Sequence, residues 1–340
     1  MTRRTRVAVV VALCVALVAA TTAFVLRQRS VQQAAQRAAE RSSSAAPTTS
    51  LTPLLAGPRI VFRESGIGPD YGRVAVIALA DPGGPRAYTS LACDRVFATR
   101  ADTLCLASDR GLVTTYSATV VDADGTRTAI PLTGSPSRAR LSADGALAAT
   151  TSFVAGDSYA ATSFSTRTVV THLADRSSVD LEDFTLVDGG QRVAPSDRNY
   201  WGVTFAADDD RFFVTVKFAG TTHLAEGRLS TRTVTTLRTD AECPSLSPDG
   251  TKVAYKKLGD RGPGDWRLAV LDLASGRETA LAEQQRLDDQ VEWLDDDHVL
   301  YGLPGQGTRA GESDVWVVPA DGSGSPRVLV HDAWSPAVVR

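Results

Sequence analysis

The sequence predicts an all-β fold, and three observations lead to it. Residues 246–255 read as a strand, a tight turn and a second strand, because Asp249 and Gly250 supply the positive-φ positions that a hairpin turn needs. The same pattern recurs along the chain, and each copy begins with a bulky apolar residue. These residues are Phe97, Leu141, Phe205, Leu246, Trp293 and Trp334. They are 44, 64, 41, 47 and 41 residues apart, and multi-stranded repeats of about forty residues are typical of propeller blades.

The remaining strands of each repeat follow in a regular order. After a hairpin comes a third strand and then, past a Gly-containing turn, a fourth, as in residues 267–273 and 278–281. Residues 59–62 resemble a second strand without a first, and residues 334–339 resemble a first strand without a second. Joining these two strands closes a ring and protects its sheet edges. We therefore expect a six-bladed β-propeller over residues 58–340, closed by its N- and C-terminal strands.

A membrane segment is predicted before this domain. Residues 7–26 contain no charged side chain and consist mostly of Val, Ala and Leu. As a helix they would span about 30 Å, the thickness of a bilayer core. Arginines flank both ends, so the charges favour a cytoplasmic N-terminus only weakly. We expect residues 1–6 to be a short cytoplasmic tail and residues 7–26 to be a single-pass transmembrane signal anchor, with the propeller on the extracytoplasmic side. The alternative is secretion after cleavage of a signal peptide, because Ala19 and Ala20 are small enough for a cleavage site.

Residues 27–57 are expected to connect the membrane segment to the propeller. Residues 28–41 are rich in Ala, Gln and Arg, which are good helix formers, and they can form either a helical stalk or a solvated tether. Residues 42–53 have the Ser-, Thr-, Ala- and Pro-rich composition of a flexible linker.

Charge and cysteine content narrow the possible partners. The formal net charge is −3, which gives no electrostatic reason to expect nucleic acid. Cys93 and Cys105 flank a predicted turn, so a disulfide between them is plausible outside the cytoplasm, while Cys243 should stay unpaired. No Cys-x-x-Cys pair and no His/Cys cluster indicates a metal site. We expect neither a metal nor a cofactor.

The motifs that could indicate catalysis have simpler explanations. Residues 156–160 resemble the serine motif of hydrolases, but Ala160 replaces the final Gly and no helical pattern follows. The acidic runs at residues 208–210 and 295–297 occupy the positions of Asp-Gly turns and do not match a calcium loop. The protein is therefore not expected to be an enzyme. The alternative is a propeller hydrolase acting on glycan or peptide, with paired carboxylates that a sequence cannot place across a ring.

A binding surface is predicted where the repeat is longest. The interval of 64 residues after Leu141 contains extra residues at 154–167 and 182–200, and both stretches should lie on the face opposite the Asp-Gly turns. Long loops on a rigid scaffold commonly bind partners, and Arg and aromatic side chains are favoured at interfaces. The predicted surface comprises Asp157, Tyr159, Ser163, Arg167, Asp183, Arg192, Arg198, Tyr200 and Trp201.

The repeat also resembles that of a known family. Ser247-Pro-Asp-Gly-Thr-Lys-Val-Ala-Tyr255, followed by Leu268-Ala-Val-Leu-Asp-Leu273, is similar to the repeat of TolB-like β-propellers, and Ser142-Ala-Asp-Gly145 is a second match. The resemblance covers most of residues 58–340, although the other four copies match weakly. It implies a bacterial, extracytoplasmic, six-bladed propeller that binds other proteins. Some family members are fused to peptidases, but no such catalytic domain is recognised here, and neither is the N-terminal domain of the Tol–Pal protein. The expected function is therefore a monomeric, membrane-anchored binding or scaffolding module for a protein or cell-envelope ligand.

Overall fold

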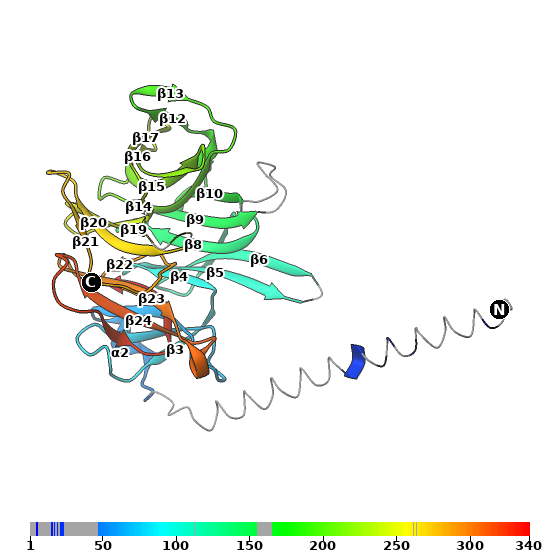
Figure 1. Cartoon of the computed structure of the whole chain (residues 1–340). Coiled ribbons are helices and arrows are strands. Elements are labelled where there is room, and N and C mark those ends of the chain that lie inside the picture. Colours follow the sequence, from blue (N-terminus) through cyan, green and yellow to red (C-terminus); the bar gives the residue numbers. More distant parts are fainter. Residues whose placement is uncertain are drawn as a thin grey trace. The chain divides into compact units, whose positions relative to one another are not determined.

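The computed structural model describes residues 47–111, 113–154, 165–260, 262 and 264–340, together with Thr5, Val15, Leu17, Ala19 and residues 21–23. Its strands form six sheets, five with four strands and one with six (Figure 1). One strand of each sheet contacts its counterpart in the next sheet, in the order β26, β4, β8, β14, β18 and β22, and β22 contacts β26 again. The sheets are therefore six blades arranged in a closed ring, as predicted.

Each blade begins with an inner strand at the axis of the ring and ends with a strand at its outer edge. In that order, the first three blades are β26 (Ala333–Val339), β1 (Arg59–Glu64), β2 (Arg73–Ala78) and β3 (Ala87–Ala92); β4 (Arg95–Ala98), β5 (Asp102–Arg110), β6 (Thr114–Asp122) and β7 (Arg127–Ile130); and β8 (Ser135–Leu141), β9 (Leu147–Val154), β10 (Ser165–His172) and β11 (Ser178–Asp180). The fourth blade is β14 (Asn199–Phe205), β15 (Arg211–Phe218), β16 (Thr221–Arg228), β17 (Thr233–Thr239), β12 (Thr185–Asp188) and β13 (Gln191–Val193). The last two are β18 (Glu242–Leu246), β19 (Lys252–Leu258), β20 (Trp266–Asp272) and β21 (Glu278–Ala280); and β22 (Glu292–Trp293), β23 (His298–Pro304), β24 (Ser313–Pro319) and β25 (Arg327–Val330).

The two ends of the propeller complete the first blade together. β26 pairs antiparallel with β1, from Arg59 opposite Val339 to Glu64 opposite Ala333.

One detail of the predicted repeat is wrong. Trp334 lies at the start of its inner strand, whereas Leu141 and the other anchors lie at or next to the turn end. The counterpart of Leu141 in this blade is Val339. The interval of 41 residues from Trp293 to Trp334 therefore joins two residues that lie at opposite ends of their inner strands.

The Asp-Gly turns form through local hydrogen bonds. In the third blade, the Ser142 hydroxyl donates to Asp144 Oδ1 at 2.7 Å, and the Gly145 amide donates to the Ser142 carbonyl at 3.0 Å. Gly145 has a φ of +80°, which an L-residue with a side chain rarely adopts. The acidic runs behave in the same way, since Asp208 accepts the Arg211 amide at 2.8 Å. Those carboxylates serve turns, as the sequence indicated.

The second long insertion differs from its prediction. Residues 181–198 do not form a loop of the third blade. After a 3-10 turn (Leu181–Asp183), β12 pairs in parallel with β17 and β13 pairs with β12, so the insertion widens the fourth blade (Figure 1). Arg198 holds the two ends of the insertion together, because it donates to the Glu182 carbonyl at 2.7 Å and to the Pro195 carbonyl at 3.3 Å.

The last part of the predicted linker forms regular structure, although a flexible segment was expected there. Thr48 forms a parallel bridge with Arg86, and a short helix, α2 (Leu51–Leu55), contacts β2 and β3. Leu51 and Leu54 pack against the core shared by the first two blades. Residues 47–57 therefore contact the propeller, mainly through Leu51 and Leu54, which the composition of the segment did not reveal. Among the described residues, no helix is long and apolar enough to cross a membrane. Most of residues 7–26 lies outside the described part of the chain.

The cysteines lie as the repeat suggested. Cys93, just before β4, and Cys105, on β5, form a disulfide with Cα atoms 5.4 Å apart. Cys243 on β18 is buried and free. Its blade lies three places from that of Cys93 in the ring.

Candidate functional site: an axial funnel

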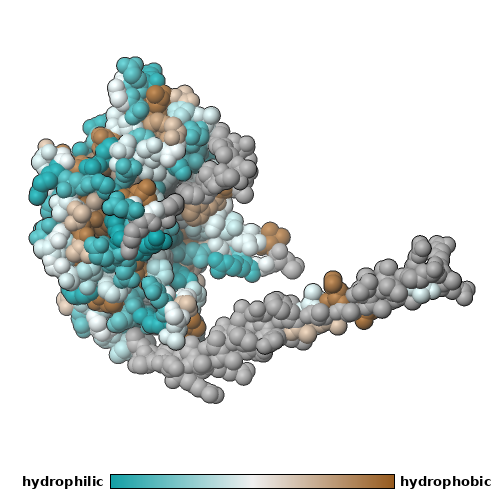
Figure 2. Space-filling view, in the orientation of Figure 1, coloured by the Kyte–Doolittle hydropathy of each residue, from teal (hydrophilic) through white to brown (hydrophobic). Residues whose placement is uncertain are grey.

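The exterior seen in Figure 2 carries its hydrophobic residues singly or in small groups among hydrophilic ones. Such scattered residues are normal on a soluble surface and do not mark a site. The candidate site is instead a recess of about 550 Å³ at the Asp-Gly turn end of the inner strands. Its wall contains five residues that open the sequence repeat. These are Phe97, Leu141, Phe205, Leu246 and Trp293. In the first blade, Val338 and Val339 take the corresponding place. We call this recess the axial funnel.

A buried ion pair forms the floor of the axial funnel. Arg140 on β8 bonds through Nη1 to Glu292 on β22, and through Nη2 to the Val291 carbonyl at 3.2 Å. Its guanidinium also lies over the Phe97 ring, 4.5 Å from the centroid. Both charged side chains are more than nine-tenths buried. Because the third and sixth blades are opposite each other in the ring, this pair bridges the axis.

Behind the floor, the connection between β21 and β22 closes the axis. We call residues 282–291 the plug. Asp289 accepts hydrogen bonds from Arg95 Nη1 at 2.7 Å and from the Gly302 amide at 3.1 Å. Gln290 Nε2 donates to the carbonyls of Val203 and Pro244, on the fourth and fifth blades. A void of about 20 Å³ lies between Arg140 and this segment. The axial funnel therefore opens on one face of the ring and is closed at its base.

The plug also covers a group of buried charges. Lys256 Nζ lies 2.6 Å from Asp288 Oδ1 and 3.5 Å from Glu242 Oε2. Burial lowers the pKa of Lys256, but the nearby Cys243 thiol and the two carboxylates raise this pKa on balance. Burial raises the pKa of Glu242 despite the opposing charge of Lys256. These groups satisfy one another, so the cluster joins the plug to the fifth blade.

The charges of the axis are arranged for structure rather than for proton transfer. Each of the four axial carboxylates in the described part, Glu242, Asp288, Asp289 and Glu292, lies within 4 Å of an Arg or Lys nitrogen. A general acid or base needs a carboxyl group free to exchange its proton with substrate. Over the described ranges there is also no group of three or more His, Cys, Asp or Glu side chains that could hold a metal ion. The axial funnel is thus a recess with a partly apolar wall and a charged floor.

The sequence-predicted surface is not one continuous patch. Asp157, Tyr159 and Ser163 lie outside the described residues. Arg192 is exposed on β13 at the outer edge of the fourth blade, and Arg198 is engaged in holding the insertion. Tyr200 and Trp201 are only 1% and 5% exposed, and burial raises the pKa of Tyr200 to about 12. These two side chains were expected at the surface, but their strand, β14, is the inner strand of its blade, so they pack inside the ring.

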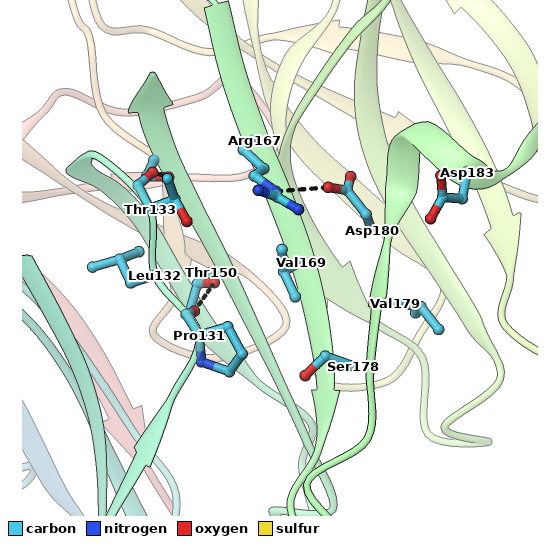
Figure 3. A pocket seen from close by; sticks show the side chains of 11 residues that line it. Pro131, Leu132, Thr133, Thr150, Arg167, Val169, Ser178, Val179, Asp180 and Asp183 are labelled. Atoms are coloured by element: carbon cyan, nitrogen blue, oxygen red, sulfur yellow. Dashed lines mark hydrogen bonds and ion pairs between the residues drawn. The ribbon is translucent and has the colours of Figure 1, made fainter. Parts of the chain in front are cut away.

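Arg167 and Asp183 instead line a separate pocket of about 300 Å³ on the third blade (Figure 3). Arg167 Nε bonds to Asp180 Oδ2 at 2.8 Å, and both side chains point into the pocket from neighbouring strands (Figure 3). The floor consists of small polar side chains such as Thr150, whose hydroxyl donates to the Pro131 carbonyl.

The plug was not predicted from the sequence, although one feature of the sequence could have indicated it. The connection before Trp293 is unusually polar, with Glu283, Arg286, Asp288 and Asp289 in succession. A polar run before an apolar anchor is normally a solvated loop. Here Glu283 and Asp289 are buried, while Arg286 and Asp288 stay exposed. The aspartates of the run pair with Arg95, Arg138 and Lys256, which distant repeats supply.

Comparisons with known proteins agree with the architecture. No family model matches the sequence. The probable dipeptidyl-peptidase 5 of Aspergillus flavus and the dipeptidyl-peptidase 5 of Aspergillus oryzae are each 34% identical over 86 residues, which is 24% of this chain and 11% of the relative. The matched segment is thus about a tenth of the length of these peptidases.

Solved structures share the fold more broadly. TolB from Acinetobacter baumannii is 15% identical, with a TM-score of 0.60 over 84% of this chain and 68% of that chain. A chain of a nidogen/laminin complex is 12% identical, with a TM-score of 0.54 over 83% of this chain and 98% of that chain. The ring of six blades defines the class as an all-β six-bladed propeller. Within that class, its fold is similar to that of the TolB propeller.

Proposed function

We propose that the protein is a binding or scaffolding module of the cell envelope, in which the axial funnel receives a segment of a partner protein. The observation that supports this role is a recess with apolar walls that is closed at its base by the plug. A recess of about 550 Å³ is within the range in which proteins bury ligand groups. We further propose that residues 7–26 anchor a monomeric propeller in the membrane, facing the extracytoplasmic space.

Catalysis is the weaker alternative for this recess. A glycan or peptide hydrolase would need an acid and a base or nucleophile facing the substrate. Glu292, the axial carboxylate that lines the recess, is bonded to Arg140. No described feature favours hydrolysis over binding. The surface predicted from residues 154–167 and 182–200 stays a prediction, and Arg167 and Asp183 are its members that line a pocket.

The test is site-specific photo-crosslinking in cells that produce the full chain. A benzophenone amino acid replaces Ala143 or Ala207, which line the axial funnel and are exposed. The matched controls are Ala123 and Ala274, which are exposed on turns between the third and fourth strands of their blades. We expect a protein adduct from Ala143 and Ala207 only. Adducts from the controls alone, or none from the funnel positions, would overturn the proposed site.

The side of the membrane on which the propeller lies can be tested separately. A cysteine introduced at exposed Ala274 should react with a membrane-impermeant maleimide in intact cells. Reaction only after lysis would place the propeller in the cytoplasm. A released, shortened protein in the medium would show that residues 7–26 are cleaved.

A further inference from the structure

The third blade carries a second recess, separate from the axis of the ring. It is the pocket of about 300 Å³ that Arg167 and Asp183 line, and we call it the interblade pocket (Figure 3). Its described lining comes from the connection at residues 131–133, from β9, β10 and β11, and from the 3-10 turn that follows them. It shares no residue with the axial funnel. The interblade pocket is therefore a candidate site of its own.

The pocket opens where the second and third blades stop packing together. Alternate residues of β9 point to the same face of the sheet. On the face directed at the second blade, Ala148 packs against Leu104 and Ile130. The next residues on this face are Thr150 and Ser152, and the connection at residues 131–133 lies beside them instead of a strand (Figure 3). The second blade thus covers one end of this face and leaves the other end open.

The fourth blade fills the same positions with apolar side chains. The third and fourth repeats are offset by 64 residues, so Val214 and Val216 are the counterparts of Thr150 and Ser152. Both valines are 0% exposed and belong to the core between the third and fourth blades. Thr150 and Ser152 are nearly as buried, at 2% exposed each, although a buried hydroxyl is costly without a hydrogen bond. Packing of the blades alone favours valine here, so the two hydroxyls indicate a polar ligand.

The polar side chains of the pocket are aligned across three strands. The register of the sheet places Thr150 and Asp180 in one cross-strand row and Ser152 and Arg167 in the next. Arg167 Nε bonds to Asp180 Oδ2 at 2.8 Å. Within the described ranges, neither the two Nη groups of Arg167 nor the carboxylate of Asp183 has a hydrogen-bond partner. A ligand in the pocket can therefore bond to both side chains without displacing another partner.

These groups define what a ligand must offer. The hydroxyls of Thr150 and Ser152 donate to the carbonyls of Pro131, at 3.4 Å, and of Thr133. Their oxygens therefore present lone pairs to the pocket, and the carboxylates also accept, whereas the guanidinium only donates. A simple cation would meet the guanidinium, and a simple anion would meet the carboxylates. Hydroxyl groups suit all of these partners, because each can donate and accept at the same time.

A ring that carries several hydroxyl groups matches this arrangement. Leu132 and Val169 add apolar surface for the C–H groups of such a ring. The volume of about 300 Å³ is at the lower end of the range of ligand pockets, which suits a single ring. We propose that the interblade pocket binds one ring of a carbohydrate, either a free sugar or the end of a glycan chain. This site goes beyond the proposed function, because it involves neither the axial funnel nor the partner segment.

The test is saturation-transfer difference NMR on the full chain, in a detergent whose headgroup is not a sugar. The probes are the methyl glycosides of glucose, galactose, mannose, fucose and N-acetylglucosamine. We expect at least one probe to receive saturation from the protein. Arg167→Ala should raise the Kd of that probe about tenfold, because a hydrogen bond to a charged group typically changes affinity by about that factor. Thr150→Val, which installs the residue type of the fourth blade, should raise it about fivefold through loss of a neutral hydrogen bond.

Arg277→Ala is the matched control and should leave the Kd unchanged. Arg277 is exposed on the turn between β20 and β21, outside the interblade pocket. Melting temperatures close to that of the wild type show that the variants fold. Absence of saturation in every probe would overturn the proposal, and so would a Kd that neither Arg167→Ala nor Thr150→Val changes. An equal loss in Arg277→Ala, or tighter binding of zwitterionic glycylglycine than of every sugar, would contradict the proposed ligand class.

The two sources of the ring can be told apart. An oligosaccharide that ends in the ring of the best probe is titrated alongside that probe. Equal or weaker binding of the oligosaccharide supports recognition of a free sugar. Binding that is at least about tenfold tighter supports a glycan chain that continues past the exposed side chains of Arg167 and Asp183.

Discussion

Arg95 and Asp289 connect blades that are not neighbours in the ring, with Nη1 of Arg95 2.7 Å from Oδ1 of Asp289. Asp289 is 1% exposed, and its other oxygen accepts the Gly302 amide. Removing one partner of a buried pair leaves an uncompensated charge, which typically costs about 3–5 kcal/mol. We expect Asp289→Ala to lower the free energy of unfolding by that amount in urea denaturation. Exposed Asp124→Ala is the control and should change it by less than about 0.5 kcal/mol. Equal effects of the two changes would show that the plug does not stabilise the ring.

The closure of the ring can be tested at Gly302. A Cβ atom there would lie 2.4 Å from Cε3 of Trp334, at the start of β26. Gly302→Ala should therefore destabilise the protein by about 1–3 kcal/mol, as overpacking usually does. Gly83→Ala is a matched control, because its Cβ would meet no atom within 4 Å. Adding Trp334→Leu to Gly302→Ala should relieve part of the cost. A cost that is unchanged in the double variant would separate Gly302 from the packing of Trp334.

The disulfide should be a measurable part of the stability. Cys93 and Cys105 are 12 residues apart in sequence, and a crosslink that closes a loop of about 15 residues typically contributes about 3 kcal/mol. We expect a reducing agent to lower the melting temperature of the wild type but not that of the Cys93→Ser, Cys105→Ser double variant. Because Cys243 is buried and free, Cys243→Ala should keep its sensitivity to the reductant. Loss of that sensitivity in Cys243→Ala would point to a different pairing.

Acid stability should depend on Asp314. Burial raises the pKa of this carboxyl. Hydrogen bonds from Arg309 and the Asp332 amide lower the pKa by more than burial raises it, so the pKa in the folded state lies below its usual 3.8. A carboxyl with a lowered pKa stabilises the fold above its unfolded pKa, and this contribution is lost as the pH falls through the folded value. Asp314→Asn should therefore be less stable than the wild type at pH 7, and the difference should shrink below about pH 3.8. Urea denaturation across this range, with exposed Asp124→Asn as control, provides the measurement. A difference that grows on acidification would reverse the assigned sign.

The parts of the fold that follow local rules could be predicted from the sequence. The turn at Asp249-Gly250 needs only Gly250 at a φ of +72° and the Ser247 side chain, and both lie within a few residues. The blade count followed from repeating this unit. The predicted position of Trp334 was wrong. An inner strand has two ends, and an apolar residue in the sequence does not show which of them it occupies.

The candidate site depends on contacts that no local pattern encodes. Arg95 and Asp289 are 194 positions apart, and Arg140 and Glu292 are 152 apart. The repeat anchors could be predicted as blade residues, but their second role in the wall of the axial funnel appears only when the ring is closed. The parallel pairing of β12 with β17 was also hidden, because β17 lies after β14, β15 and β16 in the chain.

Completion of the first blade by β26 also sets an order of events during synthesis. At a ribosome speed of about 5–20 residues per second, β1 emerges well before the strand that will lie inside it. The first blade to be made is thus the last to be completed, and the inner edge of β1 stays unpaired until residues 333–339 arrive. A nascent chain exposes this edge to other strands for the whole interval, so a holding chaperone should associate with it until the ring closes.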